Sequence, residues 1–197
     1  MADWTPGIPE EEFHHRQPRC GLITKAEVRV LSLAKLRIRE ESVIWDIGAG
    51  SGSVAIEAAL IAGRGSVWAI EKNAEDMENI ARNVGKFGVT NVTAMNAVAP
   101  ERLDEFPDPD AVFIGGSGGE MREILGIVGK RLRTGGRVVV NAITLDSSYE
   151  AVSFMKELGF EVETTLVQIA RSKALLGKTS FEALNPIYII TGKRPGE

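Results

Sequence analysis

The sequence is poor in cysteine and contains no long apolar run. Cys20 is the only cysteine among 197 residues, which excludes an intramolecular disulfide and a zinc site built from cysteines. No apolar run approaches the roughly 20 residues that cross a bilayer, and the first residues lack the apolar stretch of a signal peptide. We therefore expect a soluble, cytoplasmic protein with no membrane partner.

The sequence also lacks an excess of positive charge. Its 23 Lys and Arg residues face 27 Asp and Glu residues, which gives a formal net charge of −4. A chain with this balance has no global positive field to attract nucleic acid, so we expect no nucleic-acid partner. A negatively charged substrate would have to be held by a local basic patch.

Length and composition predict one compact domain. Hydrophobic residues make up 44% of the chain, which is enough for a large buried core. Residues 1–23 contain three prolines and an acidic run, which is typical of an irregular arm. Thr24 and Glu27 have the spacing of a capping box, which predicts a helix from there to about Arg39. We therefore divide the chain into an N-terminal arm, 1–23, and a domain, 24–197.

Short apolar runs alternate with helical patterns along most of the domain. The runs cover residues 42–46, 66–71, 91–95, 111–115 and 137–141. The segments between them repeat apolar residues at helical spacing. Strands that alternate with helices predict βαβ units and an α/β fold with a doubly wound, mainly parallel, Rossmann-like sheet.

The pattern changes near the C-terminus. Two apolar stretches, 160–170 and 186–191, follow one another without a clear helix between them. We expect them to form an antiparallel hairpin that closes one edge of the sheet. Residues 170–186, which include Gly177 and Asn185 as breakers, are predicted to be a loop.

A glycine-rich motif follows the first predicted strand and precedes a helix of small residues. It reads Asp-Ile-Gly-Ala-Gly-Ser-Gly over residues 46–52. Glycines at such a turn let the backbone approach a bound nucleoside closely. A dinucleotide-binding fingerprint would place its third glycine at Ser53. The observed D-x-G-x-G-x-G spacing instead resembles the first motif of class I methyltransferases.

Two further positions at strand ends fit a nucleoside. Glu71 closes the second predicted strand, where a carboxylate can accept hydrogen bonds from both ribose hydroxyls. Asn96 and Ala97 follow the third strand, where this fold class contacts adenine, although Asn96 is also compatible with a plain turn. These positions and the glycine motif together predict S-adenosyl-L-methionine as the cofactor.

The remaining motifs extend the resemblance over nearly the whole chain. They are IPEEEF at 8–13, LITKAEVR at 22–29, DAVFIGGSGG at 110–119 and VNAITL at 140–145. The chain lacks the Asn-Pro-Pro-Tyr signature of amino-group methylases and the Pro-Cys of cytosine C5 enzymes. With these motifs it resembles the decarboxylating precorrin methyltransferases of cobalamin biosynthesis.

The resemblance implies methylation of C15 of a precorrin or cobalt-precorrin, with decarboxylation of the ring C acetate. It also implies a homo-oligomer, namely a tetramer, and adds Thr24 to the cofactor set, although Thr24 is equally compatible with a simple helix cap. The sequence is compatible with a free-standing enzyme and with the C-terminal half of a fused C5,C15-methyltransferase. A C5-methyltransferase domain or chain would then be its partner.

The predicted site falls into two groups, with no metal among its components. The expected cofactor-binding residues are Thr24, Asp46, Gly48, Ala49, Gly50, Ser51, Gly52, Glu71, Asn96 and Ala97. The expected substrate-binding residues are Gly115, Gly116, Ser117, Gly118, Gly119 and Asn141. The loop 115–119 is also compatible with a flexible strand-to-helix connection.

Catalytic residues are not assigned, because an electron-rich macrocycle needs no strong protein base for methyl transfer. His14 and His15 are candidates for a proton donor after decarboxylation, although such residues are more often solvated. Basic residues that could pair with substrate carboxylates are Arg16, Arg19, Lys25, Arg29, Arg171, Lys173 and Lys178. The alternatives are a methyltransferase of the same fold that acts on RNA or protein, and a non-catalytic nucleotide-binding protein.

Overall fold

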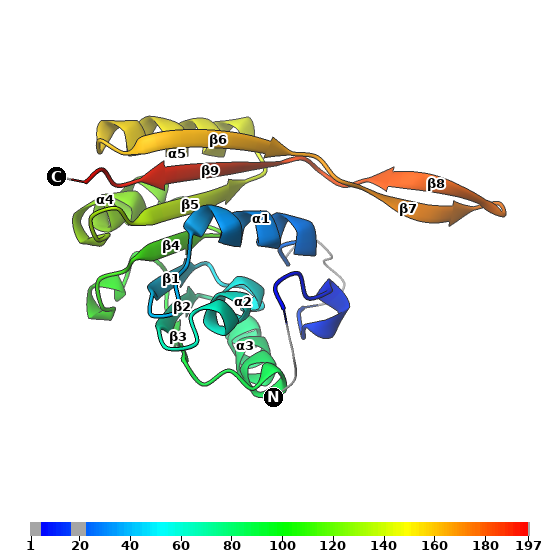
Figure 1. Ribbon diagram of the computed structural model, residues 1–197, viewed down its shortest axis with the longest axis horizontal. Coiled ribbons are helices and arrows are strands. Elements are labelled where there is room, and N and C mark those ends of the chain that lie inside the picture. The colour runs from blue at the N-terminus through cyan, green and yellow to red at the C-terminus, as the bar shows by residue number, and fades with distance from the viewer. Residues whose placement is uncertain (1–4, 17–22, 197) are drawn as a thin grey trace.

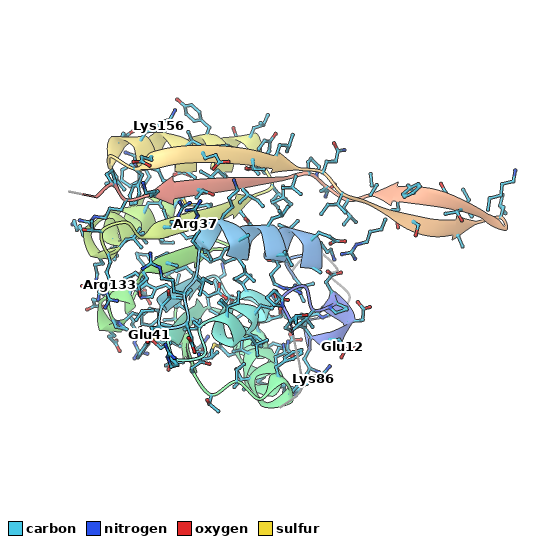
Figure 2. The ribbon with its side chains drawn as sticks, in the orientation of Figure 1. Glu12, Arg37, Glu41, Lys86, Arg133 and Lys156 are labelled. Carbon is cyan, nitrogen blue, oxygen red and sulfur yellow. The ribbon has the colours of Figure 1, made fainter. Side chains whose placement is uncertain are left out.

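The computed structural model describes residues 5–16 and 23–196 (Figure 1). Its main feature is a seven-stranded sheet with the order β3-β2-β1-β4-β5-β9-β6. The first five strands of that order run parallel: β1 (Val43–Ile47), β2 (Ser66–Glu71), β3 (Val92–Asn96), β4 (Ala111–Ile114) and β5 (Arg137–Ala142). Five helices connect or flank them: α1 (Ala26–Leu36), α2 (Ser53–Ile61), α3 (Ala74–Phe87), α4 (Met121–Arg131) and α5 (Leu145–Glu157). Short 3₁₀ helices cover Glu10–Glu12 and Leu103–Glu105.

The helices cover both faces of the sheet, so the predicted doubly wound α/β fold is confirmed (Figure 1). Side chains of α1, α2 and α3 pack in one hydrophobic cluster against one face, and those of α4 and α5 pack in a second cluster against the other. Successive residues of a strand point to opposite faces. Ile44 therefore joins the first cluster and Trp45 the second, and both are fully buried. Among the described residues, no helix is long and apolar enough to span a membrane.

The C-terminal strands form the predicted antiparallel edge. Strand β9 (Ile187–Lys193) pairs antiparallel with β5 on one side and with β6 (Glu161–Val167) on the other. The prediction of a loop over residues 170–186 is wrong. These residues form a second, two-stranded sheet from β7 (Ala170–Leu175) and β8 (Lys178–Ala183), which projects beyond the main sheet (Figure 1).

The composition of this projecting hairpin explains the wrong prediction. None of the side chains of β7 and β8 is buried, so the segment lacks the apolar alternation of a half-buried strand. Its two-residue turn has Leu176 and Gly177 at φ values of 49° and 75°. Positive φ at both central residues is what a tight hairpin turn needs. Leucine is an unusual residue there, which hides the turn in the sequence.

The start of α1 also differs from the prediction. Lys25 is the N-cap, and no side chain of the N-cap itself binds a helix amide, so the capping box of Thr24 and Glu27 is not formed. The amide of Ala26 instead donates to Oε1 of Glu10 at 2.5 Å. The carboxylate of Glu10, from a distant segment, thus caps the helix in place of the expected Thr24 hydroxyl. The helix ends at Leu36 because the next residue takes a left-handed conformation.

The described part of the N-terminal arm is packed onto the domain. Ile8 and Phe13 are buried, with 2% and 4% of their surface exposed. The fully buried side chain of Asn83 on α3 accepts from the His14 amide and donates to the carbonyls of His14 and Ser51. This single amide group therefore joins the arm to the glycine motif.

Candidate functional site

The carboxyl ends of the parallel strands surround a pocket of about 350 Å³, which we call the glycine-loop pocket. The loop after β1 contributes Gly48 and Gly50, and the region after β2 contributes Glu71, Lys72 and Asp76. The remaining walls come from Ala97, Val98 and Ala99 after β3, and from residues 115–118 after β4. Ligands of open α/β sheets bind at this edge, where the strand order reverses.

The three glycines of the motif have different physical roles. All have positive φ values, 71° for Gly48, 55° for Gly50 and 75° for Gly52. A Cβ on Gly48 would lie 2.4 Å from the carbonyl oxygen of Gly116, so this glycine lets two loops approach each other. Gly52 similarly makes room for Ile80 of α3. Among the three, Gly48 and Gly50 line the pocket.

Glu71 links the glycine loop to the next strand end. Its Oε2 accepts from the Gly50 amide at 2.8 Å, and its Oε1 accepts from the Asn73 amide at 2.9 Å. Only 8% of the residue is exposed, yet it lines the pocket. Each carboxylate oxygen has a second lone pair, so Glu71 can still accept hydrogen bonds from a ligand.

Asp46 lies beneath the loop and does not line the pocket. Its Oδ2 accepts from the Ala55 amide at 2.9 Å and so satisfies a free donor in the first turn of α2. Burial, helped by the nearby charge of Glu71, raises the pKa of Asp46 to about 7 in spite of the lowering effect of that hydrogen bond. Its other oxygen, Oδ1, has no hydrogen-bond partner. A protonated Asp46 is favoured by these surroundings.

We expect this carboxyl group to make the protein less stable as pH rises from about 4 to about 7. The unfolded chain restores the ordinary pKa of 3.8, so between the two values the folded state retains a proton that the unfolded state releases. Each pH unit in this window should lower the free energy of unfolding by up to about 1.4 kcal/mol. Urea unfolding of the wild type and Asp46→Asn at pH 5 and pH 7 measures this contribution. A stability difference between the two proteins that is the same at both pH values would contradict the prediction.

The other expected cofactor residues are distributed unevenly. Ala97 lines the pocket, whereas the side-chain amide of Asn96 donates to the Glu71 carbonyl at 2.8 Å and lies outside it. Ala49 and Ser51 also lie outside the lining. Ser51 is buried, and its carbonyl is held by Asn83. These three residues shape the loops rather than face the hollow.

A second hollow of about 370 Å³ adjoins the first, and we call it the adjoining chamber. Gly115 and Ile143 line both hollows. The chamber contains the predicted residues Thr24 and Asn141, together with Lys25 and Asn185. Thr24, expected beside the cofactor, is therefore placed on the other side of the shared wall. The side-chain amide of Asn141 donates to the Ser32 hydroxyl of α1 at 3.0 Å, which fixes its orientation.

The predicted substrate loop lies mainly on the glycine-loop pocket. Gly116, Ser117 and Gly118 line that pocket alone, and Gly119 lines neither hollow. Helix α4 begins at Met121 with Glu120 as its N-cap, so an acidic residue precedes the helix amides that were expected to attract an anion. Most of the predicted substrate loop thus lines the same pocket as the predicted cofactor residues.

Most of the basic residues expected around a substrate are paired within the protein. Arg29 is fully buried, and its Nε contacts Oε1 of Glu57 at 2.7 Å. Arg171 binds Glu10 and Glu27, and Lys173 binds Glu182 on the projecting hairpin. The prediction that Arg29 rings the pocket mouth is therefore wrong, because its guanidinium is buried against Glu57 and donates to the Thr24 carbonyl.

The remaining predicted basic and proton-donating residues lie on the N-terminal arm, on the projecting hairpin, or outside the described residues. Arg16 pairs with Asp76 at 2.8 Å and lines the glycine-loop pocket. His14 and His15 lie next to it but line neither hollow. Arg19 and Cys20 lie outside the described residues. Lys178 lies on the projecting hairpin, beyond both hollows.

Sequence reasoning missed Ile143, which is 68% exposed and forms part of the wall between the hollows. The available signal was its position directly after β5, at the same sheet edge as the glycine loop. It also missed Asn185 and Leu184, because their segment was expected to be a loop without a place in the site.

Comparison with known proteins links this chain to the precorrin methyltransferases. Residues 15–194 match the family model described as "Precorrin methyltransferase domain". The chain is 40% identical over 192 residues to a protein of Sulfurisphaera tokodaii, covering 96% of this chain and 98% of the relative. It is 43% identical over 190 residues to a protein of Pyrobaculum calidifontis, covering 95% of each. Both are named "Probable cobalt-precorrin-6B C(15)-methyltransferase (decarboxylating)".

A solved structure shares the fold of this chain. The crystal structure named precorrin-6y C5,15-methyltransferase, from Geobacter metallireducens, superposes with a TM-score of 0.90 and is 46% identical in sequence. The match covers 95% of this chain and 97% of that one.

Proposed function

Because the chain belongs to the precorrin methyltransferase family, we propose that it methylates C15 of a precorrin or cobalt-precorrin and decarboxylates the ring C acetate. Its relatives carry this activity in their names. The observation that carries the proposal is the meeting of Gly50, Glu71 and the loop 115–118 in one hollow that shares a wall with a second hollow. The first suits a cofactor and the second an acceptor.

The residues present fit S-adenosyl-L-methionine. The glycine loop offers backbone without side chains, and the Glu71 carboxylate can accept hydrogen bonds from ribose hydroxyls. Ala97 and Val98 offer apolar surface for adenine. When bound, the cofactor supplies a methyl group on a positively charged sulfur. Five further residues that were predicted to bind the cofactor would act indirectly, by shaping these loops: Asp46, Ala49, Ser51, Gly52 and Asn96.

The protein's part in methyl transfer is to orient the acceptor and exclude water. An electron-rich carbon of the macrocycle attacks in line, so no side chain needs to remove a proton first. Gly115 and Ile143, at the wall between the hollows, define where the two reactants can meet. Correct orientation alone corresponds to effective molarities of about 10⁵ M or more.

Calorimetry with S-adenosylhomocysteine and with NAD tests the cofactor assignment. We expect binding of S-adenosylhomocysteine only. Conversion of a precorrin or cobalt-precorrin, followed by mass spectrometry, tests the substrate. If the protein binds S-adenosylhomocysteine but converts neither tetrapyrrole, the corrinoid substrate is refuted. The protein would then be a methyltransferase that acts on another substrate.

Replacing Glu71 with alanine should weaken binding of S-adenosylhomocysteine by about 1 to 3 kcal/mol, because the ribose hydroxyls lose a charged acceptor. The Gly50 amide also loses its partner, which loosens the loop. Calorimetric titration measures the change. Glu75→Ala, an exposed carboxylate on the first turn of α3, is the matched control and should bind as the wild type does. A loss within experimental error for Glu71→Ala would assign it a purely structural role.

We also propose a homo-oligomer, namely a tetramer. The projecting hairpin β7–β8 supports this proposal, because Leu175, Leu176 and Phe181 are 56%, 95% and 71% exposed on it. An isolated two-stranded hairpin is only marginally stable in water, so contact with another subunit would stabilise it. A C5-methyltransferase domain or chain is the proposed functional partner, since the Geobacter structure is named for both methylations.

A further inference from the structure

One arginine lines the glycine-loop pocket within the part of the chain that the structure describes, and it comes from the N-terminal arm. This residue is Arg16. Two positions earlier, the amide and the carbonyl of His14 are both bound by the side chain of Asn83 on α3. The same side chain donates to the Ser51 carbonyl in the glycine loop. The arm is therefore anchored to the loop close to the point where Arg16 reaches the pocket.

The guanidinium of Arg16 is held on the Glu71 side of the pocket. Its Nη2 pairs with Oδ2 of Asp76 at 2.8 Å, and the Asp76 side chain is only 5% exposed. Asp76 lies in the first turn of α3, for which Asn73 is the N-cap. The Asn73 amide in turn donates to Oε1 of Glu71 at 2.9 Å. Arg16, Asp76 and Glu71 thus lie together in the pocket lining.

Asp76 neutralises the charge that Arg16 brings to the pocket. An ion pair without net charge attracts a substrate carboxylate less than a free guanidinium would, and it does not repel a positively charged sulfur. The other cation of the described lining, Lys72, is exposed, and its Nζ lies 3.8 Å from the position of a Cβ at Gly118, on the loop after β4. The Arg16–Asp76 pair therefore suits a neutral polar group of the cofactor better than a carboxylate of the substrate.

Arg16 and Glu71 have complementary hydrogen-bonding abilities. A guanidinium has five N–H donors and no acceptor, whereas a carboxylate only accepts. The Nε of Arg16 is buried and has no hydrogen-bond partner, and a buried donor without an acceptor costs free energy. A ribose hydroxyl can donate one hydrogen bond and accept others. It can therefore donate to Glu71 and accept from Arg16 at the same time.

We propose that Arg16 binds the cofactor, and that its guanidinium donates a hydrogen bond to a ribose hydroxyl whose own proton is donated to Glu71. This inference rests on the proposed function. Asp76 holds the guanidinium beside the ribose, and a small shift of the side chain brings the unpaired donor toward the hydroxyl oxygen. Cofactor binding then ties the arm to the glycine loop through a second contact, besides the one made by Asn83.

Arg16→Gln tests the proposal in calorimetric titrations with S-adenosylhomocysteine and with its 2′-deoxy and 3′-deoxy analogues. We expect the Kd for S-adenosylhomocysteine to rise about tenfold, which is the effect of losing one hydrogen bond from a charged donor. One of the two deoxy analogues should bind the variant and the wild type within about twofold of each other, because the hydroxyl that Arg16 contacts is already missing from it. This cancellation identifies the hydroxyl, and a general disturbance of the pocket would not produce it.

Two variants outside both hollows serve as controls. Glu12→Gln breaks the ion pair of the arm with Lys86 on α3, and so tests whether loosening the arm is enough to weaken binding. Arg82→Gln removes an exposed arginine of the same helix that pairs with Glu78. Both variants should bind S-adenosylhomocysteine within about twofold of the wild type.

Arg16→Lys serves where Arg16→Gln does not fold, because it retains a cation beside the buried Asp76. The ammonium group lacks the planar fork that spans two acceptors, so it should also weaken binding of S-adenosylhomocysteine and show the same cancellation with one deoxy analogue.

Unchanged affinity for S-adenosylhomocysteine in Arg16→Gln would overturn the proposal. So would an equal loss of affinity for S-adenosylhomocysteine and both deoxy analogues, or an equal loss in Glu12→Gln, since Arg16 would then act only by holding the arm. A wild-type protein that does not bind S-adenosylhomocysteine would instead refute the proposed function.

Discussion

Gly50→Val is expected to abolish measurable binding of S-adenosylhomocysteine while the protein still folds. Gly50 lines the glycine-loop pocket at a φ of 55°, and its amide donates to Glu71. A β-branched side chain would occupy the space of the nucleoside. It would also disfavour the left-handed backbone by about 1 to 2 kcal/mol, which would disturb the hydrogen bond to Glu71. Calorimetry measures the binding, and circular dichroism the fold.

The matched control for this change is Gly88→Val. Gly88 ends α3 with a φ of 66°, and a Cβ there would have no atom within 4 Å. The substitution imposes similar backbone strain away from both hollows. It should lower stability but leave the affinity for S-adenosylhomocysteine unchanged. Normal binding by a folded Gly50→Val protein would show that the nucleoside does not lie on this loop.

Glu57→Gln should lower the free energy of unfolding by about 3 to 5 kcal/mol, because it leaves a buried guanidinium without its counter-ion. Glu57 and Arg29 are both fully buried. The two carboxylate oxygens accept from the amides of Gly7 and Ile8, and glutamine keeps only one acceptor oxygen, so the arm also loses part of its attachment to α2. Urea unfolding measures the loss.

An exposed carboxylate provides the comparison for Glu57. Glu78 pairs with Arg82 one turn away on α3, and both side chains are more than half exposed. Glu78→Gln should therefore change stability by no more than about 0.5 kcal/mol. Equal effects of the two substitutions would mean that the Arg29–Glu57 pair contributes no more than a surface pair does.

The sequence predicted the sheet well because its signals are local. Strand β2 was expected at its observed bounds, since a buried parallel strand is a continuous apolar run between polar turns. The antiparallel edge of β6 and β9 followed from two such runs without a helix between them. The position of Glu71 at a strand end likewise placed it beside Gly50.

The rest depends on contacts between distant segments. That Glu10 would cap α1, or that Arg29 would pair with Glu57 rather than face solvent, has no local signature. The division between two hollows also could not be foreseen, because Thr24 and Asn141 meet only through the packing of α1 on β5. Exposed strands such as β7 escape prediction because they bury nothing.

The place of β9 between β5 and β6 has a consequence for how the chain folds during its synthesis. Strands β1 to β5 can pair as they leave the ribosome, since each has its neighbour earlier in the chain or separated by one βαβ unit. Strand β6 emerges before β9 but joins the sheet only through it. Until Lys193 has emerged, β5 presents an unpaired edge and β6 has no partner. An open edge can pair with another chain, so the nascent protein is most exposed to misassembly, and most in need of a chaperone, in this interval.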